Sequence, residues 1–411
     1  MKPREWLRSI GPAIIVAAVV LGPGSILTSS KVGASFGYPA LAVLALSVVL
    51  MIGMVALAGR LGLAYERSLC DELAARLGRW AAVAVGGILF LVVALFQSSN
   101  NIAVVAGLEP LFDGAFDSFP LRAAVLVGMN LFVIVCLFAL RHLYGAVERL
   151  MKVLIMVLVV AFVVNFLVAL FTPRDFVPVA GGGPRDLVPL LGMIGTTFSV
   201  AGAFYQAYLV REKGWRLRDA GRNMADSAVS ITVLGVVTAV ILATSVLAFH
   251  GRPGVDLASV GDVANQLVPL FGSTARVVFC IGILAGACSS FLVNAMIGGA
   301  IFSDSLGLGS RMDGKGPRHF TALALLIGLA VGLARLAEAQ GTVQLITLAQ
   351  ALTVLGLPAL ALALVYLGTR PELTGNRKVP RWILVLAMAG LAVACLVAVR
   401  MAGIVWEKLA G

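Results

Sequence analysis

Long apolar stretches separated by short polar connections dominate this chain of 411 residues. Runs of about 18 to 25 predominantly apolar residues, the length that crosses a bilayer as a helix, recur along the whole sequence. Eleven such runs start near residues 11, 40, 81, 121, 152, 187, 227, 274, 320, 343 and 382. The pattern predicts an all-α polytopic membrane protein with 11 transmembrane helices. We expect residues 1–411 to form a single transmembrane domain in the cell membrane, because no connection is long enough to fold as a soluble domain.

The composition supports the same class. Hydrophobic residues make up 60% of the chain and charged residues 12%, and the mean hydropathy is +1.01. The net charge of +11 is compatible with a protein that binds nucleic acid. However, 22 of the 31 Lys and Arg residues lie inside if the N-terminus is cytoplasmic. Cytoplasmic loops of membrane proteins are rich in Lys and Arg, so the charge predicts an N-in, C-out topology and no nucleic-acid partner.

The order of the spans indicates an internal duplication. Spans one to five and six to ten make halves of five helices, about 10–172 and about 187–368, followed by an additional helix at about 382–403. An odd number of helices per half implies inverted repeats, since the second half enters from the opposite side. We expect a monomer.

The leading helix of each half contains a weak point. In the first span Gly22-Pro23-Gly24-Ser25 combines a missing backbone donor with two poor helix formers, which predicts local unwinding. In the sixth span the weaker counterpart is Ser199-Val200-Ala201-Gly202-Ala203. Irregular backbone at membrane depth is tolerated where it lines a cavity, whereas a simple kink or close helix packing is the alternative.

One cation and one polar run stand out inside the apolar spans. Lys31 follows the first break, and Gly24, Thr28 and Lys31 share one helical face that looks toward it. Snorkelling to the outer interface is the alternative for Lys31. The run Gln97-Ser98-Ser99-Asn100-Asn101 either lines the pathway or ties helices together by hydrogen bonds.

The first span resembles that of the Nramp metal transporters. It contains Gly11-Pro12-Ala13, Gly22-Pro23-Gly24-Ser25 and Phe36-Gly37-Tyr38 in the order and spacing of that family's Gly-Pro-Ala, Asp-Pro-Gly-Asn and Phe-Gly-Tyr. The resemblance implies a LeuT-type inverted-repeat fold and transport by alternating access.

Shorter similarities extend along nearly the whole chain. Arg60-Leu61-Gly62 with Asp71-Glu72-Leu73 resembles the end of the family's second helix, and Gly286-Ala287-Cys288-Ser289-Ser290 resembles its eighth. Gln350 with Leu357-Pro358 resembles the tenth.

The departures from the family concern the metal site. Gly22 and Ser25 occupy the positions at which Nramps carry a metal-binding Asp and an Asn. Ser199-Val200-Ala201 occupies the position of the family's Met-Pro-His in the sixth helix. Asn101 and Val104 replace the acidic pair of the third helix, and Ala201 and Gln206 replace two histidines of the sixth. The comparison implies that the usual proton-coupling residues are absent.

These replacements lead us to expect a small anion such as bicarbonate as the substrate. Two half-helix N-termini and Lys31 would favour negative charge near the breaks. The alternative is a divalent cation, Mn²⁺ or Mg²⁺, held in hydrated form by neutral oxygens. A polar neutral solute is a third possibility.

We expect no catalytic residues and no cofactor, because no nucleophile, paired carboxylate or metal-ligand spacing indicates an enzyme. The candidate substrate-binding residues are Gly22, Pro23, Gly24, Ser25, Thr28, Lys31, Gln97, Asn100, Asn101, Ser199, Val200, Ala201, Gly202, Gln206 and Gln350.

Overall fold

A computed structural model describes residues 11–112, 118–140, 142–172, 186–252, 257, 273–337 and 354–410. Within these ranges the chain is helical and contains no strand. The first half comprises α2 (Ala13–Val20), α3 (Pro23–Phe36), α4 (Ala40–Ala64), α5 (Leu69–Leu77), α6 (Arg79–Leu108), η1 (Glu109–Leu111), α7 (Phe119–Ala139) and α8 (Leu143–Phe171). The remainder comprises α9 (Val188–Thr197), α10 (Val200–Glu212), η2 (Leu217–Asp219), α11 (Ala220–Phe249), α13 (Ser273–Ser305), α14 (Lys315–Ala337), η3 (Val354–Gly356), α16 (Leu357–Gly368), η4 (Gly375–Arg377) and α17 (Arg381–Ala410).

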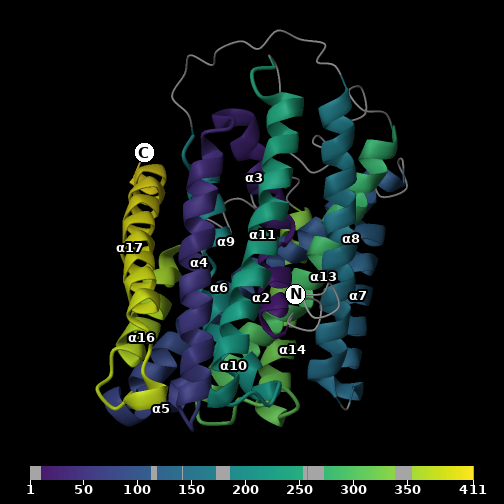
Figure 1. Ribbon diagram of the computed structural model, residues 1–411. Helices are drawn as coiled ribbons and strands as arrows, with labels where there is room; N and C mark the ends of the chain where they lie inside the picture. The colour runs from purple at the N-terminus through teal and green to yellow at the C-terminus, as the bar shows by residue number, and fades with distance from the viewer. Residues whose placement is uncertain are drawn as a thin grey trace.

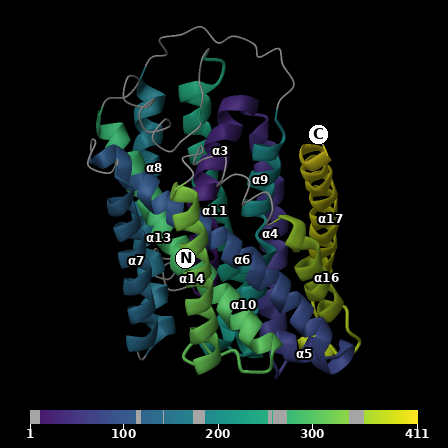
Figure 2. The same cartoon turned by 180° about the vertical axis from the view of Figure 1, so that it is seen from behind.

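The helices form one upright bundle around α2 and α3 (Figure 1). The short helix α2 packs against α8, α11 and α13, and every one of its eight residues is buried. The reverse view shows α7 and α8 at one edge and α17 at the other (Figure 2). The broken first span is therefore the centre of the molecule.

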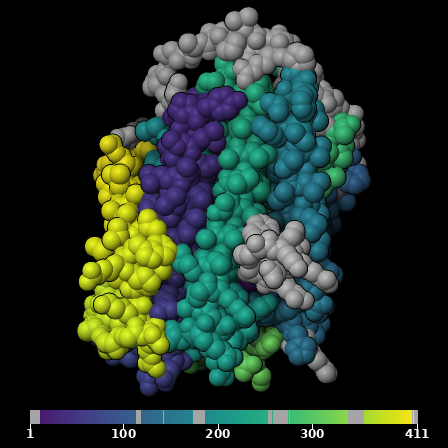
Figure 3. Space-filling model, in the orientation of Figure 1, coloured from purple at the N-terminus to yellow at the C-terminus, as the bar shows by residue number. Residues whose placement is uncertain are grey.

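The outer face is apolar and suited to lipid. Figure 3 shows α17, α4, α11 and α8 side by side on this surface. Phe132 of α7, Met156 and Phe171 of α8 and Val399 of α17 are each at least 65% exposed. Large apolar side chains exposed over whole helices are expected where the solvent is hydrocarbon.

Nine of the described helical segments are long and apolar enough to cross a membrane, and the pair α2 and α3 makes a tenth if counted as one bent span. The polytopic all-helical class is thereby confirmed. The count of eleven, the repeat boundaries and the N-in, C-out orientation stay predictions. The tenth predicted span begins near residue 343, and residues 338–353 lie outside the described part of the chain.

Several connections that carry Lys or Arg residues lie together at one end of the bundle, the lower end in Figure 1. They include α5, the turn between α10 and α11, the connection from α13 to α14 and that from α16 to α17. The predicted topology assigns these connections to the cytoplasm. Below, this end is called the basic end.

Candidate substrate site at two helix breaks

The first break separates α2 from α3, which are bent by 57° relative to each other. Gly22 adopts an extended conformation (φ −77°, ψ 172°), and Pro23 begins α3. A proline at this position costs no helical hydrogen bond, because the first N–H groups of a helix have no intrahelical partner. Ser25 folds back and donates to the carbonyl of Val20 at 2.5 Å. The sequence Gly-Pro-Gly-Ser thus breaks the helix where its local chemistry predicts.

The second break lies between α9 and α10. Phe198 (φ −88°, ψ 60°) and Ser199 (φ −77°, ψ 88°) leave the helical conformation. The Ser199 hydroxyl caps α10 by accepting from the backbone N–H of Gly202 at 3.4 Å. A serine cap compensates here for the absence of proline.

Hydroxyl groups from α13 satisfy the last carbonyls of α2. Ser290 donates to Val19 at 2.5 Å, and Ser289 donates to Ala18 at 2.9 Å. A Cβ atom at Gly22 would lie only 2.1 Å from the Ser290 hydroxyl. Ser290 therefore occupies the space into which any larger residue at position 22 would project.

The two breaks border a pocket of about 50 Å³. Its polar side chains are Ser25, Thr196, Ser199 and Asn294, contributed by α3, α9, α13 and the cap of α10. Val19, Val20, Val92, Val93, Phe96, Gly195, Ala201, Gly356, Leu357 and Leu360 complete the lining. The lining residues that the structure describes thus offer neutral oxygen ligands and include no carboxylate, imidazole or thioether. Among the described residues, no group of three or more His, Cys, Asp or Glu could hold a metal ion.

Of the predicted binding residues, Ser25, Ser199 and Ala201 line this pocket. Gly22, Pro23 and Gly24 form the first break, and Val200 and Gly202 form the first turn of α10. Thr28 and Lys31 lie further along α3 and are not among the lining residues. Thr28 donates to the carbonyl of Gly24 at 2.7 Å, and Lys31 is half-buried.

The polar run of α6 makes contacts between helices. Gln97 donates to the carbonyl of Phe291 on α13 at 2.5 Å, and Asn100 donates to Gln97 at 3.0 Å. Asn101 accepts from Asn130 of α7 at 2.7 Å. All of these amides are buried, and none lines the pocket. Their arrangement matches the helix-tying alternative, and substrate binding by Gln97, Asn100 and Asn101 stays a prediction.

Two further predicted residues lie away from the pocket lining. Gln206 is buried in α10 and donates to Asn223 of α11 at 3.3 Å. Gln350 lies outside the described residues. Both assignments stay predictions.

Sequence reasoning missed two polar lining residues, Thr196 and Asn294. Asn294 is the one amide in the α13 sequence and follows Ser290 by four residues, so both lie on the same helical face. That single amide in an apolar span was an available signal. Thr196 lies in the last turn of α9, two residues before Phe198, and it carried no comparable signal.

Asp226 of α11 holds the start of α2 in place. Its two carboxylate oxygens accept from the backbone N–H groups of Gly11 at 2.6 Å and Ala13 at 2.8 Å. Ser230 also donates to it, at 3.2 Å. A carboxylate at a helix N-terminus satisfies orphan donors and complements the helix dipole. The contact joins residues more than 200 positions apart, and no local pattern in the sequence predicts it.

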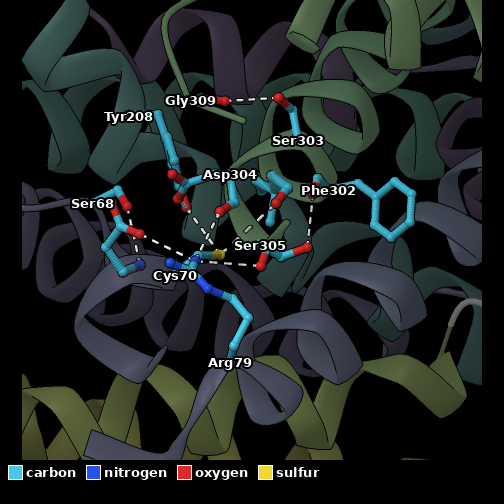
Figure 4. Close-up of polar contacts among 11 residues, drawn as sticks. Ser68, Cys70, Arg79, Tyr208, Phe302, Ser303, Asp304, Ser305 and Gly309 are labelled. Atoms are coloured by element: carbon cyan, nitrogen blue, oxygen red, sulfur yellow. Dashed lines mark hydrogen bonds and ion pairs between the residues drawn. The ribbon is translucent and has the colours of Figure 1, made fainter. Parts of the chain in front are cut away.

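A second buried polar cluster ties α10 to the basic end (Figure 4). Tyr208 donates to the carboxylate of Asp304 at 2.8 Å and contacts the sulfur of Cys70 at 3.3 Å. Burial raises the pKa of the Cys70 thiol well above its ordinary value, so the thiol stays protonated. Arg79 at the start of α6 donates to the backbone carbonyl of Asp304 at 3.5 Å. The cluster links α5, α6, α10 and α13.

Replacing Tyr208 by phenylalanine should destabilise the protein. The Tyr208→Phe change removes a hydrogen bond to a buried carboxylate, which contributes about 1.5 to 3 kcal/mol. We expect a lower thermal unfolding temperature in detergent, with Tyr38→Phe, at a 49% exposed position, as the matched control. Equal unfolding temperatures for Tyr208→Phe and the wild type would show that this hydrogen bond does not stabilise the fold.

The comparisons with known proteins agree with this architecture. Residues 13–403 match the family described as natural resistance-associated macrophage protein-like, or Nramp. A divalent metal cation transporter from Mesorhizobium japonicum is 25% identical, with 94% of this chain and 87% of the relative covered. One from Xanthomonas campestris pv. campestris is 26% identical, with 93% and 88% covered. The crystal structure of a manganese transporter from Eremococcus coleocola superposes with a TM-score of 0.78 at 21% identity, covering 96% of this chain and 86% of that one.

A central pocket between two broken helices, inside a bundle of membrane-spanning helices, defines a LeuT-type transporter of the multi-pass membrane class. This chain belongs to the Nramp family. The family resemblance of the first span and the fold that it implied are confirmed.

The expectation of a small anion as the substrate is wrong. The named relatives are divalent metal cation transporters, and the similar solved structure is a manganese transporter. The structure supplies a physical reason. The breaks present two helix C-termini, those of α2 and α9, as well as two N-termini, and the N-terminus of α3 begins with Pro23, which has no N–H to offer an anion. Lys31 is not among the residues that line the pocket.

Proposed function

We propose that this protein transports a divalent metal cation by alternating access, with the ion held between the two helix breaks by neutral oxygens. The observation that carries the proposal is the oxygen-only polar lining of the pocket, Ser25, Thr196, Ser199 and Asn294, in a chain of the Nramp family. Oxygen ligands suit hard divalent ions.

The ligand set favours Mg²⁺ and Mn²⁺ over softer ions. A thioether selects soft metals, and the described part of the pocket lining contains none. Mg²⁺ loses its water reluctantly and is usually bound with several waters retained. A pocket of about 50 Å³ has room for a partly hydrated ion, since a cavity of about 10 to 15 Å³ already holds one water.

The backbone compensates little of the ion's charge. The C-termini of α2 and α9 both end at the pocket, and each helix C-terminus is equivalent to about half a negative charge. The N-termini of α3 and α10 begin at the same breaks and carry the opposite partial charge, so the net compensation is much less than a carboxylate pair would supply. Binding should therefore be weaker than in a site with acidic ligands.

Uptake into proteoliposomes tests the proposal. We expect saturable uptake of Mg²⁺ and Mn²⁺, with little discrimination between them and weaker uptake of Cd²⁺, because the lining residues that the structure describes include no soft ligand. Asn294→Leu should reduce the uptake by about tenfold, since an amide that contributes about 1.4 kcal/mol of binding is replaced by an apolar side chain. Arg218→Gln, at an 84% exposed position of η2, is the control. Liposomes that take up no divalent cation, or carry anions without one, would refute the proposal.

A further inference from the structure

A second hollow, of about 380 Å³, lies at the basic end of the bundle. It is formed by the end of α16, the connection that contains η4 and the beginning of α17. Its polar lining includes Thr369, Arg370, Thr374 and Lys378, and its apolar lining includes Leu384 of α17. The hollow is therefore polar on the side of the connection and apolar on the side of the membrane helix.

The connection around the hollow is held in a fixed conformation. Arg60 of α4 donates to the backbone carbonyls of Asn376 and Lys378. The N–H of Lys378 donates to the carbonyl of Gly375 at 3.2 Å, and Gly375 takes the positive φ of 53° that the turn requires. A prearranged backbone reduces the entropy that a ligand must overcome.

Both charged residues of the lining, Arg370 and Lys378, are cations. The guanidinium of Arg370 lies 3.9 Å from the centre of the Tyr366 ring, and its Nε donates to the Tyr366 carbonyl at 2.9 Å. The neighbouring acids are engaged elsewhere. Glu66 pairs with Arg377 at 3.4 Å, and Glu372 approaches Arg76 at 3.8 Å. The hollow thus has a net positive lining.

The membrane side of the hollow continues onto an exposed apolar strip of α17. Trp382 is 48% exposed, Val385 64% and Met388 55%. Leu384 and Met388 are four residues apart and share a helical face, with Val385 beside them. Figure 3 shows α16 and α17 on the outer surface of the bundle. A tryptophan beside basic residues at the end of a membrane helix is typical of headgroup depth.

We propose that this hollow binds the headgroup of an anionic phospholipid, with the phosphate between Arg370 and Lys378 and an acyl chain along the exposed strip of α17. Arginine binds phosphate through paired hydrogen bonds, and lysine adds a compact positive charge. Basic hollows beside membrane helices are suited to such headgroups. The inference does not depend on which ion the central pocket carries.

Native mass spectrometry of the full-length protein with phosphatidylglycerol and phosphatidylcholine tests the site. The wild type should retain phosphatidylglycerol in preference to phosphatidylcholine. The double variant Arg370→Gln and Lys378→Gln should lose that preference by at least about tenfold, because two phosphate contacts disappear. The control is the variant Arg218→Gln and Arg222→Gln, which removes the same charge from exposed positions of η2 and α11, 84% and 76% exposed. It should keep the preference.

The single variant Lys378→Gln and competition with inorganic phosphate distinguish lipid binding from a folding defect and from binding of a soluble phosphate. Lys378→Gln alone leaves the backbone contacts of Arg60 in place, so a smaller loss of preference is expected even if the double variant folds poorly. Equal retention of both lipids by the wild type, or unchanged retention by the variants, would overturn the proposal. Displacement of phosphatidylglycerol by inorganic phosphate alone would assign the hollow to a soluble phosphate and would also overturn it.

Discussion

Introducing a carboxylate at the first break should abolish transport when made alone and strengthen metal binding when Ser290 is removed with it. A Cβ atom at position 22 would lie 2.1 Å from the Ser290 hydroxyl and 3.0 Å from its Cβ. Overpacking of this kind costs about 1 to 3 kcal/mol, and a buried unpaired carboxylate adds to that cost. The Gly22→Asp variant should therefore fold poorly or fail to transport.

The double variant Gly22→Asp and Ser290→Gly relieves the clash. It also frees the carbonyl of Val19, which accepts from Ser290 in the native chain. Asn294, one turn from Ser290 on α13, lines the pocket, so the new carboxylate would project beside the ion. We expect Mn²⁺ to bind at least about tenfold more tightly, about 1.4 kcal/mol, as measured by isothermal titration. Ser290→Gly alone is the control. Unchanged affinity in a folded double variant would show that position 22 does not face the ion.

Removing the carboxylate of Asp226 should loosen the packing of α2 against α11. In the Asp226→Ala variant the buried N–H groups of Gly11 and Ala13 lose their acceptors. Each unsatisfied buried donor costs about 1 to 3 kcal/mol, so the arrangement in which α2 is buried should lose about 3 kcal/mol, a shift of about a hundredfold in its equilibrium with arrangements that expose α2.

Thiol labelling measures that shift. A cysteine introduced by Val16→Cys, on the buried surface of α2, should react with a maleimide much faster in the Asp226→Ala background. Ser230→Ala removes only one hydrogen bond to Asp226 and should have a much smaller effect. Equal labelling rates with and without Asp226 would mean that the carboxylate does not hold α2.

The fold class and the first break could be predicted from the sequence, because short stretches of sequence determine both. Apolar run length sets the spans, and Gly22-Pro23-Gly24-Ser25 weakens a helix whatever surrounds it. The second break was the weaker prediction, because the serine that caps α10, Ser199, is a residue type that also occurs inside unbroken helices. The resemblance to the Nramp family matched the two breaks to corresponding positions in that family's first and sixth helices.

The contacts that complete the site depend on tertiary packing, which one sequence does not reveal. Asp226 reaches α2 across more than 200 residues, and Ser290 fills the space left by Gly22 from another helix. The prediction of a negatively charged substrate was wrong for a related reason. Lys31 was given weight as a lone cation in an apolar span, whereas the pocket is bordered by helix ends of both signs and by neutral oxygens.

The most direct test of the central claim is a crystal structure of the protein with Mn²⁺, located by its anomalous scattering. We expect a peak between the two breaks, within coordination distance of oxygens from Ser25, Ser199 or Asn294 and their neighbouring carbonyls. A peak elsewhere in the bundle, or an empty central pocket at saturating Mn²⁺, would contradict it.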